Sequence, residues 1–313
     1  CEDAVYNFLK SEVMKMEINM KRFFTVVLIA LLSCTIACAQ GSHSQLQGHE
    51  PDHNKPIHKP SVNNSQKTKV DISPTIGKAN YTPNVKTFYA NGVSFDMVEV
   101  RGGTFRMGAT PEQGGDAESD EKPVHSVTLS SYYIGKTEVT QALWKSVMGS
   151  NPSYWKGDNL PVECVSWDDC QEFIRKLNAL TSQHFRLPTE AEWEFACRGG
   201  NNSRGYKYSG NNYIDNVAWY SNNSGHKTHP VATKSPNELG IYDMSGNVDE
   251  WCNDWYGGYT SGRQTNPKGP YDGSFRVRRG SSGFDGAVDC RSSYRDGSIP
   301  SLRDSNLGLR LAL

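Results

Sequence analysis

The chain has 313 residues, and its 33 lysines and arginines against 34 aspartates and glutamates give a formal net charge of −1. This balance excludes the strongly basic composition of a typical nucleic-acid binder, so we expect no nucleic-acid partner. Only 36 % of the residues are hydrophobic while 29 are glycines, which indicates a fold with many turns. Eight cysteines are too few for a disulfide-dense scaffold of this length.

Residues 20–39 have the layout of a secretory signal peptide. Lys21 and Arg22 precede an apolar run, 23–32, which is too short to span a bilayer, since that takes ~20 apolar residues. Cleavage before Gln40 fits secretion, whereas Cys34 or Cys38 fits lipid attachment in a bacterial lipoprotein. Both alternatives stay open. We expect an exported bacterial protein, periplasmic, outer-membrane-anchored or at the cell surface, which contacts membrane only through a lipid anchor.

The segments on either side of this signal carry little fold information. Residues 1–19 are expected to be upstream sequence outside the native protein. Residues 40–88 are polar and rich in Ser, Asn, His, Lys and Pro, so they cannot bury enough apolar surface to offset the entropy of the chain. We therefore predict a flexible linker over 40–88 and a folded domain over 89–313.

The first part of this domain has the pattern of short strands. Apolar residues alternate over 93–100, and a second short strand is expected over 104–107, after a glycine turn at Gly102-Gly103. Further strands are expected over 124–129 and 132–134.

Three helices follow. The first is predicted over 140–148 and ends at Gly149. The second begins at the capping residue Ser166, with Asp169 at the capping-box position, and its apolar face is Cys170, Phe173, Ile174, Leu177 and Leu180. The third opens at Thr189 and runs to Gly199. After Gly200 there is almost no periodicity, so the fold class is α+β with little regular secondary structure.

Eight motifs occur in sequence through this domain. They are MVEVRGGTFRMG (97–108), KTEVTQ (136–141), PVECVSW (161–167), RLPTEAEWEFACRGG (186–200), GIYDMSGNVDEW (240–251), VRRG (277–280), CRSS (290–293) and NLGLR (306–310). In this order they resemble the formylglycine-generating enzyme family, also called sulfatase-modifying factors. The resemblance covers residues 88–313 and implies a C-type lectin-like fold.

The enzymes of that family oxidise a sulfatase cysteine to formylglycine with two active-site cysteines and copper, which soft thiolates suit. In this chain the corresponding stretch, 281–289, contains no cysteine. We therefore expect a non-catalytic member that binds no copper. A sulfatase-activating oxidase remains the enzymatic alternative, and a structural envelope lipoprotein is a third.

The resemblance also assigns roles to the cysteines of the domain. Cys197 and Cys290 match a family disulfide, and the positions of a second family disulfide hold Ile174 and Leu311. The other three are expected either to be free or to form one bridge, Cys164–Cys252 or Cys170–Cys252.

Two family calcium sites have counterparts here, and calcium is the expected cofactor because its ligands are oxygens. The first site would use Asp243, Gly246, Val248 and Glu250. The second would use Asn216, Val217, Asn223 and Gly225. The alternative is that these residues form turns and that Glu250 is a solvated acid.

In the last segment, 276–313, residues of the family motifs, such as Arg279, Cys290 and Arg310, are separated by stretches of small, mixed residues. We call the motif residues the frame of the segment. The segment resembles the C-terminal variable region of retroelement-diversified proteins, which carry changeable ligand contacts on C-type lectin scaffolds. The residues expected to contact an unknown protein or glycan ligand are Phe284, Asp285, Val288, Asp289, Tyr294, Asp296, Ser298, Ile299, Leu302 and Asp304. Phe284, Asp285, Val288, Tyr294 and Ile299 are expected to be solvent-exposed on one face. The alternative is an ordinary inactive family member.

Overall fold

The computed structural model describes residues 82–313. The predicted upstream segment, signal peptide and most of the linker lie outside these residues. The linker boundary is corrected, because the first strand, β1, already spans Val85–Ala90 and pairs with the next strand. Within the described part, no helix is long and apolar enough to cross a membrane.

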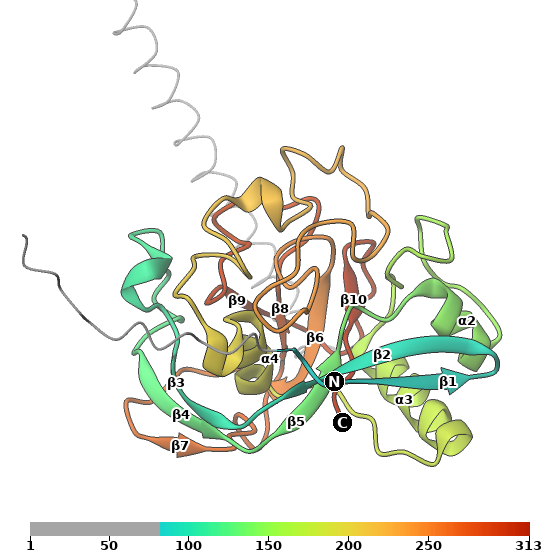
Figure 1. The fold of residues 1–313 in the computed structure, drawn as a ribbon, viewed down its shortest axis with the longest axis horizontal. Coiled ribbons are helices and arrows are strands. Elements are labelled where there is room, and N and C mark those ends of the chain that lie inside the picture. The colour runs from blue at the N-terminus through green and yellow to red at the C-terminus, as the bar shows by residue number, and fades with distance from the viewer. Residues whose placement is uncertain (1–81) are drawn as a thin grey trace, which may run out of the picture. The chain divides into compact units, whose positions relative to one another are not determined.

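Two three-stranded sheets are formed mainly by the N-terminal half of the domain, and one short strand joins one of them from the C-terminal half (Figure 1). In the first, β2 (Val93–Val100) lies between β1 and β5 (Tyr132–Gly135). In the second, β4 (His125–Leu129) lies between β3 (Gly103–Met107) and β7 (Gln264–Thr265). The predicted strands on either side of the glycine turn are therefore present but belong to different sheets.

A four-stranded sheet, in the order β10-β6-β8-β9, carries the C-terminal segment. The strands are β6 (Asp249–Trp255), β8 (Arg276–Arg279), β9 (Arg295–Ser298) and β10 (Leu307–Leu309). Figure 1 shows β6, β8 and β10 close together in the middle of the domain. None of these four strands was predicted. The sheet places the segment 276–313 against the core of the domain.

The three predicted helices are confirmed as α2 (Gln141–Met148), α3 (Trp167–Thr181) and α4 (Glu190–Cys197). The capping boxes of α3 and α4 are both formed. Short 3-10 turns lie at Pro111–Gln113, Gly200–Asn202 and Ile214–Asn216. One detail of the predicted apolar face was wrong, because Leu180 near the end of α3 is 50 % exposed.

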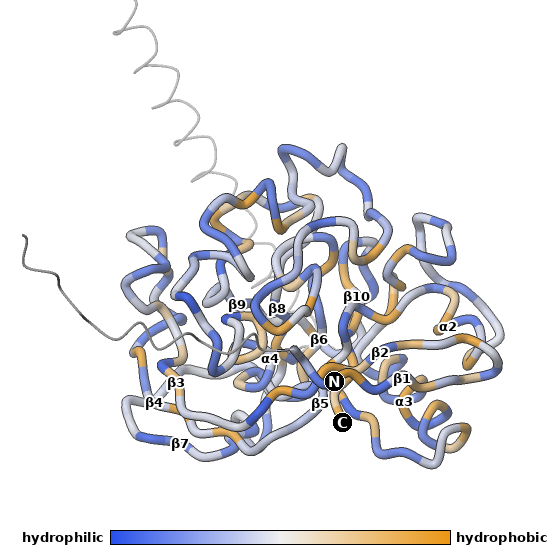
Figure 2. The backbone as a smooth tube through the Cα atoms, in the orientation of Figure 1, coloured by the Kyte–Doolittle hydropathy of each residue, from blue (hydrophilic) through white to orange (hydrophobic). Residues whose placement is uncertain are grey.

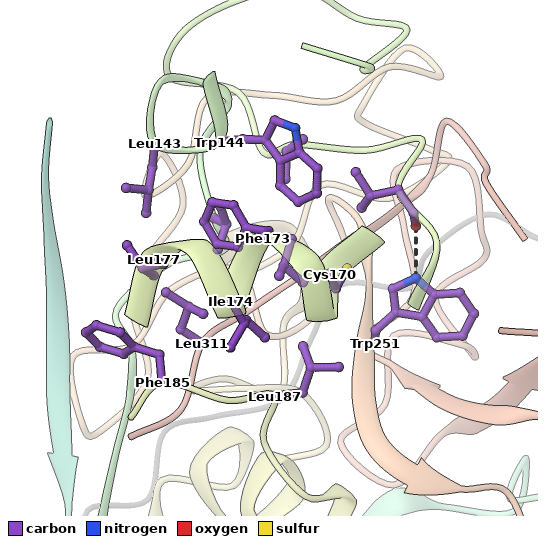
Figure 3. Packing of buried hydrophobic residues seen from close by; sticks show 14 of the residues in the cluster. Leu143, Trp144, Cys170, Phe173, Ile174, Leu177, Phe185, Leu187, Trp251 and Leu311 are labelled. Carbon is purple, nitrogen blue, oxygen red and sulfur yellow. Dashed lines mark hydrogen bonds between the residues drawn. The ribbon is translucent and has the colours of Figure 1, made fainter. Parts of the chain in front are cut away.

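The core around α2 and α3 is packed by large side chains (Figure 3). The rings of Trp144 and Phe173 stack with their centroids 4.8 Å apart, and Trp251 Nε1 donates to the carbonyl of Val165 at 3.0 Å. Ile174 and Leu311 lie in the same buried cluster. Figure 2 shows hydrophobic stretches around these helices and mostly hydrophilic outer loops.

Candidate functional site

The C-terminal segment is held by four arginines whose charges are buried. Each guanidinium pairs with a buried glutamate from another part of the chain: Arg279 with Glu194, Arg291 with Glu121, Arg295 with Glu190 and Arg310 with Glu250. Buried ion pairs of this kind are stable only when both partners are present and hydrogen-bonded. The four pairs therefore fix the backbone between the residues that were predicted to contact a ligand.

The pair of Arg291 and Glu121 shows how hydrogen bonds offset the effect of burial on a carboxylate. The two guanidinium nitrogens donate to the carboxylate at 2.6 and 2.7 Å. Burial alone would raise the pKa of Glu121, but the hydrogen bonds from Arg291 and Ser293 outweigh it and hold that pKa below its ordinary value.

The predicted ligand-binding residues fall into three groups, and none of their side chains is fully buried. Val288 and Ile299 are the most exposed apolar members, at 42 % and 49 %. Phe284, Tyr294 and Ser298 are half-buried. Of the five residues expected to be solvent-exposed, only Val288 and Ile299 are; the expectation for Phe284, Asp285 and Tyr294 is corrected, because they are partly buried. We use the name C-terminal face for Phe284, Val288, Tyr294, Ser298 and Ile299.

The second group shapes the loops. Asp285 accepts hydrogen bonds from the amide and hydroxyl of Ser282, and Asp289 accepts one from the amide of Gly286 at 3.1 Å. Asp296 forms an ion pair with Arg278. These carboxylates are therefore already used inside the chain.

The last two predicted contacts lie further along. The backbone carbonyl of Asp304 accepts from the amide of Cys164 at 2.8 Å, while its side chain is exposed. Leu302 packs against the buried cluster around α2 and α3. Its side chain is half-buried, so its role as a ligand contact stays a prediction.

The loop 221–227 borders the C-terminal face, a contact that was not predicted from the sequence. The amide of Ser221 donates to the carbonyl of Asp285 at 2.9 Å, and the ring of His226 lies 6.3 Å from the ring of Phe284. His226 and Lys227 are exposed there. The two loops are about 60 residues apart, and no local pattern in the sequence signals their contact.

The first predicted calcium site does not fit an ion as the chain is folded. Glu250 is fully buried, and its carboxylate accepts from Arg310 at 2.6 Å and from Trp193 Nε1 at 2.7 Å. Asp243 accepts from the amide of Ala232 at 2.7 Å, and burial raises its pKa to about 6. A calcium ion would have to displace a guanidinium already paired with Glu250. No group of three or more His, Cys, Asp or Glu side chains within residues 82–313 is arranged to hold a metal.

Two backbone positions of this site also have structural roles. Gly246 donates its amide to the carbonyl of Gly280, and Val248 is buried directly before β6. Both residues thus have a structural use in the absence of an ion.

The second predicted calcium site is a set of turns. Asn223 uses its side-chain oxygen to accept from the amide of Tyr220 at 2.9 Å. The carbonyl of Asn216 accepts from the amide of Ser235 at 2.9 Å. Val217 is buried, and Gly225 has a positive φ of 65°, a conformation that favours glycine. The geometry favours the turn interpretation.

The predicted Cys197–Cys290 disulfide is corrected, because all five cysteines of the described domain are free. Cys197 lies in the buried cluster around α4, and Cys290 lies in a separate one with Tyr208 and Tyr220. Burial raises the pKa of Cys197 to about 11 and the pKa of Cys290 further above its ordinary value. The alternative bridges of Cys252 are absent as well. The thiols of Cys170, Cys197, Cys252 and Cys290 are small core side chains, poorly suited to nucleophilic chemistry.

The few helices, small twisted sheets and long loops define a mixed α+β protein with a C-type lectin-like fold. The chain belongs to the sulfatase-modifying factor enzyme 1-like domain family, whose pattern it matches over residues 85–313. It is 34 % identical over 252 residues to the chaperone protein LppX of Paenibacillus barcinonensis. The matched region covers 64 % of this chain and 83 % of LppX. It is 30 % identical to the formylglycine-generating enzyme of Streptomyces coelicolor, over 69 % of this chain and 88 % of the enzyme.

Two solved structures are similar to the domain. Treponema denticola variable protein 1 matches with a TM-score of 0.66 at 35 % identity, over 74 % of this chain and 99 % of that one. PvdO from Pseudomonas aeruginosa matches with a TM-score of 0.63 at 26 % identity, over 74 % and 98 % of the two chains. The predicted family and fold are confirmed.

Proposed function

We propose that this protein is a non-catalytic binding protein of the bacterial envelope that recognises a partner protein through its C-terminal face. The single observation that carries the proposal is the contrast within residues 276–313. Four arginines of the segment, Arg279, Arg291, Arg295 and Arg310, are buried in ion pairs. Val288 and Ile299, which lie between them in the sequence, are exposed. A face whose backbone is fixed in advance loses little entropy on binding.

This chain lacks the cysteines that the enzymes of the family use for oxidation. The stretch 281–289 holds no cysteine, and the neighbouring thiol of Cys290 is buried with a raised pKa. Copper(I) is bound by soft thiolates, and a buried thiol of high pKa supplies none. We therefore assign the face to binding.

The chemistry of the face favours a protein over a glycan. Glycan recognition needs free polar groups, but Asp285, Asp289 and Asp296 are engaged within the chain. The most exposed members of the face, Val288 and Ile299, are aliphatic, and such side chains gain most by leaving water against another apolar surface. The similarity to a chaperone protein agrees with a protein partner.

The similarity to a protein named variable protein 1 supports the further proposal that the face is diversified by a retroelement. Substitutions at exposed positions usually change stability by less than about 0.5 kcal/mol, so the face tolerates variation. The test is the neighbouring DNA. A reverse transcriptase gene and a near copy of the codons for 276–313, differing at adenines, are expected, and a locus without them contradicts diversification alone.

Binding is tested with the full chain on panels of purified extracellular proteins and immobilised glycans. The double variant Val288→Asp/Ile299→Asp places charges on the face, and Tyr89→Asp is a matched control at an exposed position of β1. We expect a protein that binds the wild type and the control but binds the double variant at least about tenfold more weakly. Partners that bind all three chains equally would overturn the role of the face.

A further inference from the structure

A pocket of about 350 Å³ lies outside the C-terminal face. It is bounded by the end of β6, the start of α4 and the loop 257–270. The buried side chains of Met107, His125 and Ala191 line it, together with the aromatic rings of Trp255 and Tyr259. This volume is in the range of pockets that hold small molecules.

One of its two carboxylates is fully neutralised. Glu190 accepts two hydrogen bonds of 2.7 Å from Arg295 and one of 3.0 Å from the hydroxyl of Tyr259. Arg279 Nε lies 3.6 Å from the same carboxylate. Glu190 therefore has no need of a ligand.

The other carboxylate, Asp254, has no such cation. Its side chain lines the pocket and the residue is only 3 % exposed. Oδ2 accepts from the amide of Glu190 at 3.1 Å, whereas Oδ1 receives no hydrogen bond, and the carboxylate no ion pair, from the described residues. Burial raises the pKa of Asp254 to about 8, since a buried charge without a counter-ion is unfavourable.

Six charged groups and one titratable ring surround this carboxyl or the pocket. They are Glu190 and Glu192 of α4, Arg295 of β9, Arg276 of β8, Arg186 before α4, Lys268 at the rim and His125 of β4. The guanidinium groups of Arg295 and Arg186 are engaged by the carboxylates of Glu190 and Glu192. His125 Nδ1 lies 3.0 Å from the carbonyl of Pro123.

We propose that this pocket binds a small organic cation, an alkyl- or arylammonium ion, through the carboxylate of Asp254 and the rings of Trp255 and Tyr259. The ligand supplies the counter-charge that Asp254 lacks. The rings of Trp255 and Tyr259 already carry the guanidinium groups of Arg276 and Arg295, at 3.5 and 4.2 Å from the ring centroids, so they form the apolar wall against which the hydrocarbon part of the ligand packs. Since Asp254 is protonated before binding and ionised afterwards, binding releases a proton to solvent.

Isothermal titration calorimetry of the full chain tests this with benzylammonium and, as an uncharged probe of matched shape, benzyl alcohol. Benzylammonium should bind at least about tenfold more tightly. Its affinity should rise close to tenfold per pH unit between about pH 6 and pH 7 and level off above pH 8. Titrations in two buffers of different ionisation enthalpy should show close to one proton released at pH 7.

Two variants sharpen the test. Asp254→Asn should abolish the preference for the cation, the pH dependence and the proton release. Lys268→Ala removes a cation from the rim and should strengthen binding of benzylammonium by about twofold. The face variant Val288→Asp/Ile299→Asp should bind the probe as the wild type does, which separates this site from the proposed partner-binding function.

Equal binding of the two probes, no binding of benzylammonium at millimolar concentration, or an unchanged pH dependence in Asp254→Asn would overturn the proposal. The pH dependence of the wild type is informative by itself, so a variant that fails to fold does not remove the test.

Discussion

The guanidinium of Arg291 and the carboxylate of Glu121 form two hydrogen bonds of 2.6 and 2.7 Å between positions 170 residues apart in the chain. Both side chains are almost completely buried. This pair joins the loop before β4 to the loop that carries Val288, so the position of the C-terminal face depends on it.

Replacing Glu121 by glutamine should therefore lower the free energy of unfolding by about 3–5 kcal/mol, because it leaves the charge of Arg291 buried and unpaired. Chemical denaturation measures the change. The matched control is Glu172→Gln, which breaks the exposed pair with Arg175. It should cost far less, because exposed ion pairs are screened by water. Equal losses for both variants would contradict a structural role of the buried pair.

The core around α3 gives a second prediction. Phe173 is fully buried and stacks on Trp144, so Phe173→Ala should destabilise the domain by about 3–5 kcal/mol. Leu180→Ala on the same helix should change stability by less than about 0.5 kcal/mol, since Leu180 is half exposed. Thermal and denaturant unfolding of both variants provide the comparison, and a large loss for Leu180→Ala would place that side chain in the core after all.

The pKa of Asp254 predicts how stability depends on pH. Because burial raises this pKa from 3.8 to about 8, the folded state keeps a proton that the unfolded state has lost. The contribution of Asp254 to stability therefore falls as the pH rises between those values and is constant above about pH 8. Asp254→Asn removes this loss, so its stability relative to wild type should increase over the same range, by at most about 6 kcal/mol. A difference that does not change with pH would show that Asp254 is ionised in the folded protein.

The cysteines give a prediction about covalent structure. Cys170, Cys197, Cys252 and Cys290 are free and fully buried, so none should react with iodoacetamide in the folded protein at neutral pH. All should become alkylated after denaturation without a reducing agent. Mass spectrometry of the labelled peptides measures this. A disulfide-linked pair of peptides containing Cys197 and Cys290 in non-reduced protein would contradict this prediction and support the disulfide that the family resemblance implied.

Local sequence signals predicted the helices well. Ser166 with Asp169, and Thr189 with Glu192, form the capping boxes of α3 and α4 as expected. These signals work because a capping side chain satisfies backbone amides within its own turn. The strand β6 has no comparable signal. Its residues Asp249, Glu250 and Asp254 are acidic yet buried, and only distant partners such as Arg310 make that burial possible.

The site could be predicted only in outline, for the same reason. Sequence position identified Val288 and Ile299 as outward residues, because they stand between frame residues. It could not show that Asp285 turns back to Ser282, that Leu302 packs against the core or that His226 borders Phe284. Each of these depends on contacts that form only when the chain is folded.

The most direct test of the account is a copper-supplied formylglycine assay of the full chain on a cysteine-containing sulfatase peptide, with the Streptomyces coelicolor enzyme as the positive control. We expect no conversion of cysteine to formylglycine above the level given by copper alone, since the stretch 281–289 provides no thiolate for the metal. Turnover comparable to that of the control enzyme would contradict the central claim that this domain binds a partner and does not catalyse oxidation.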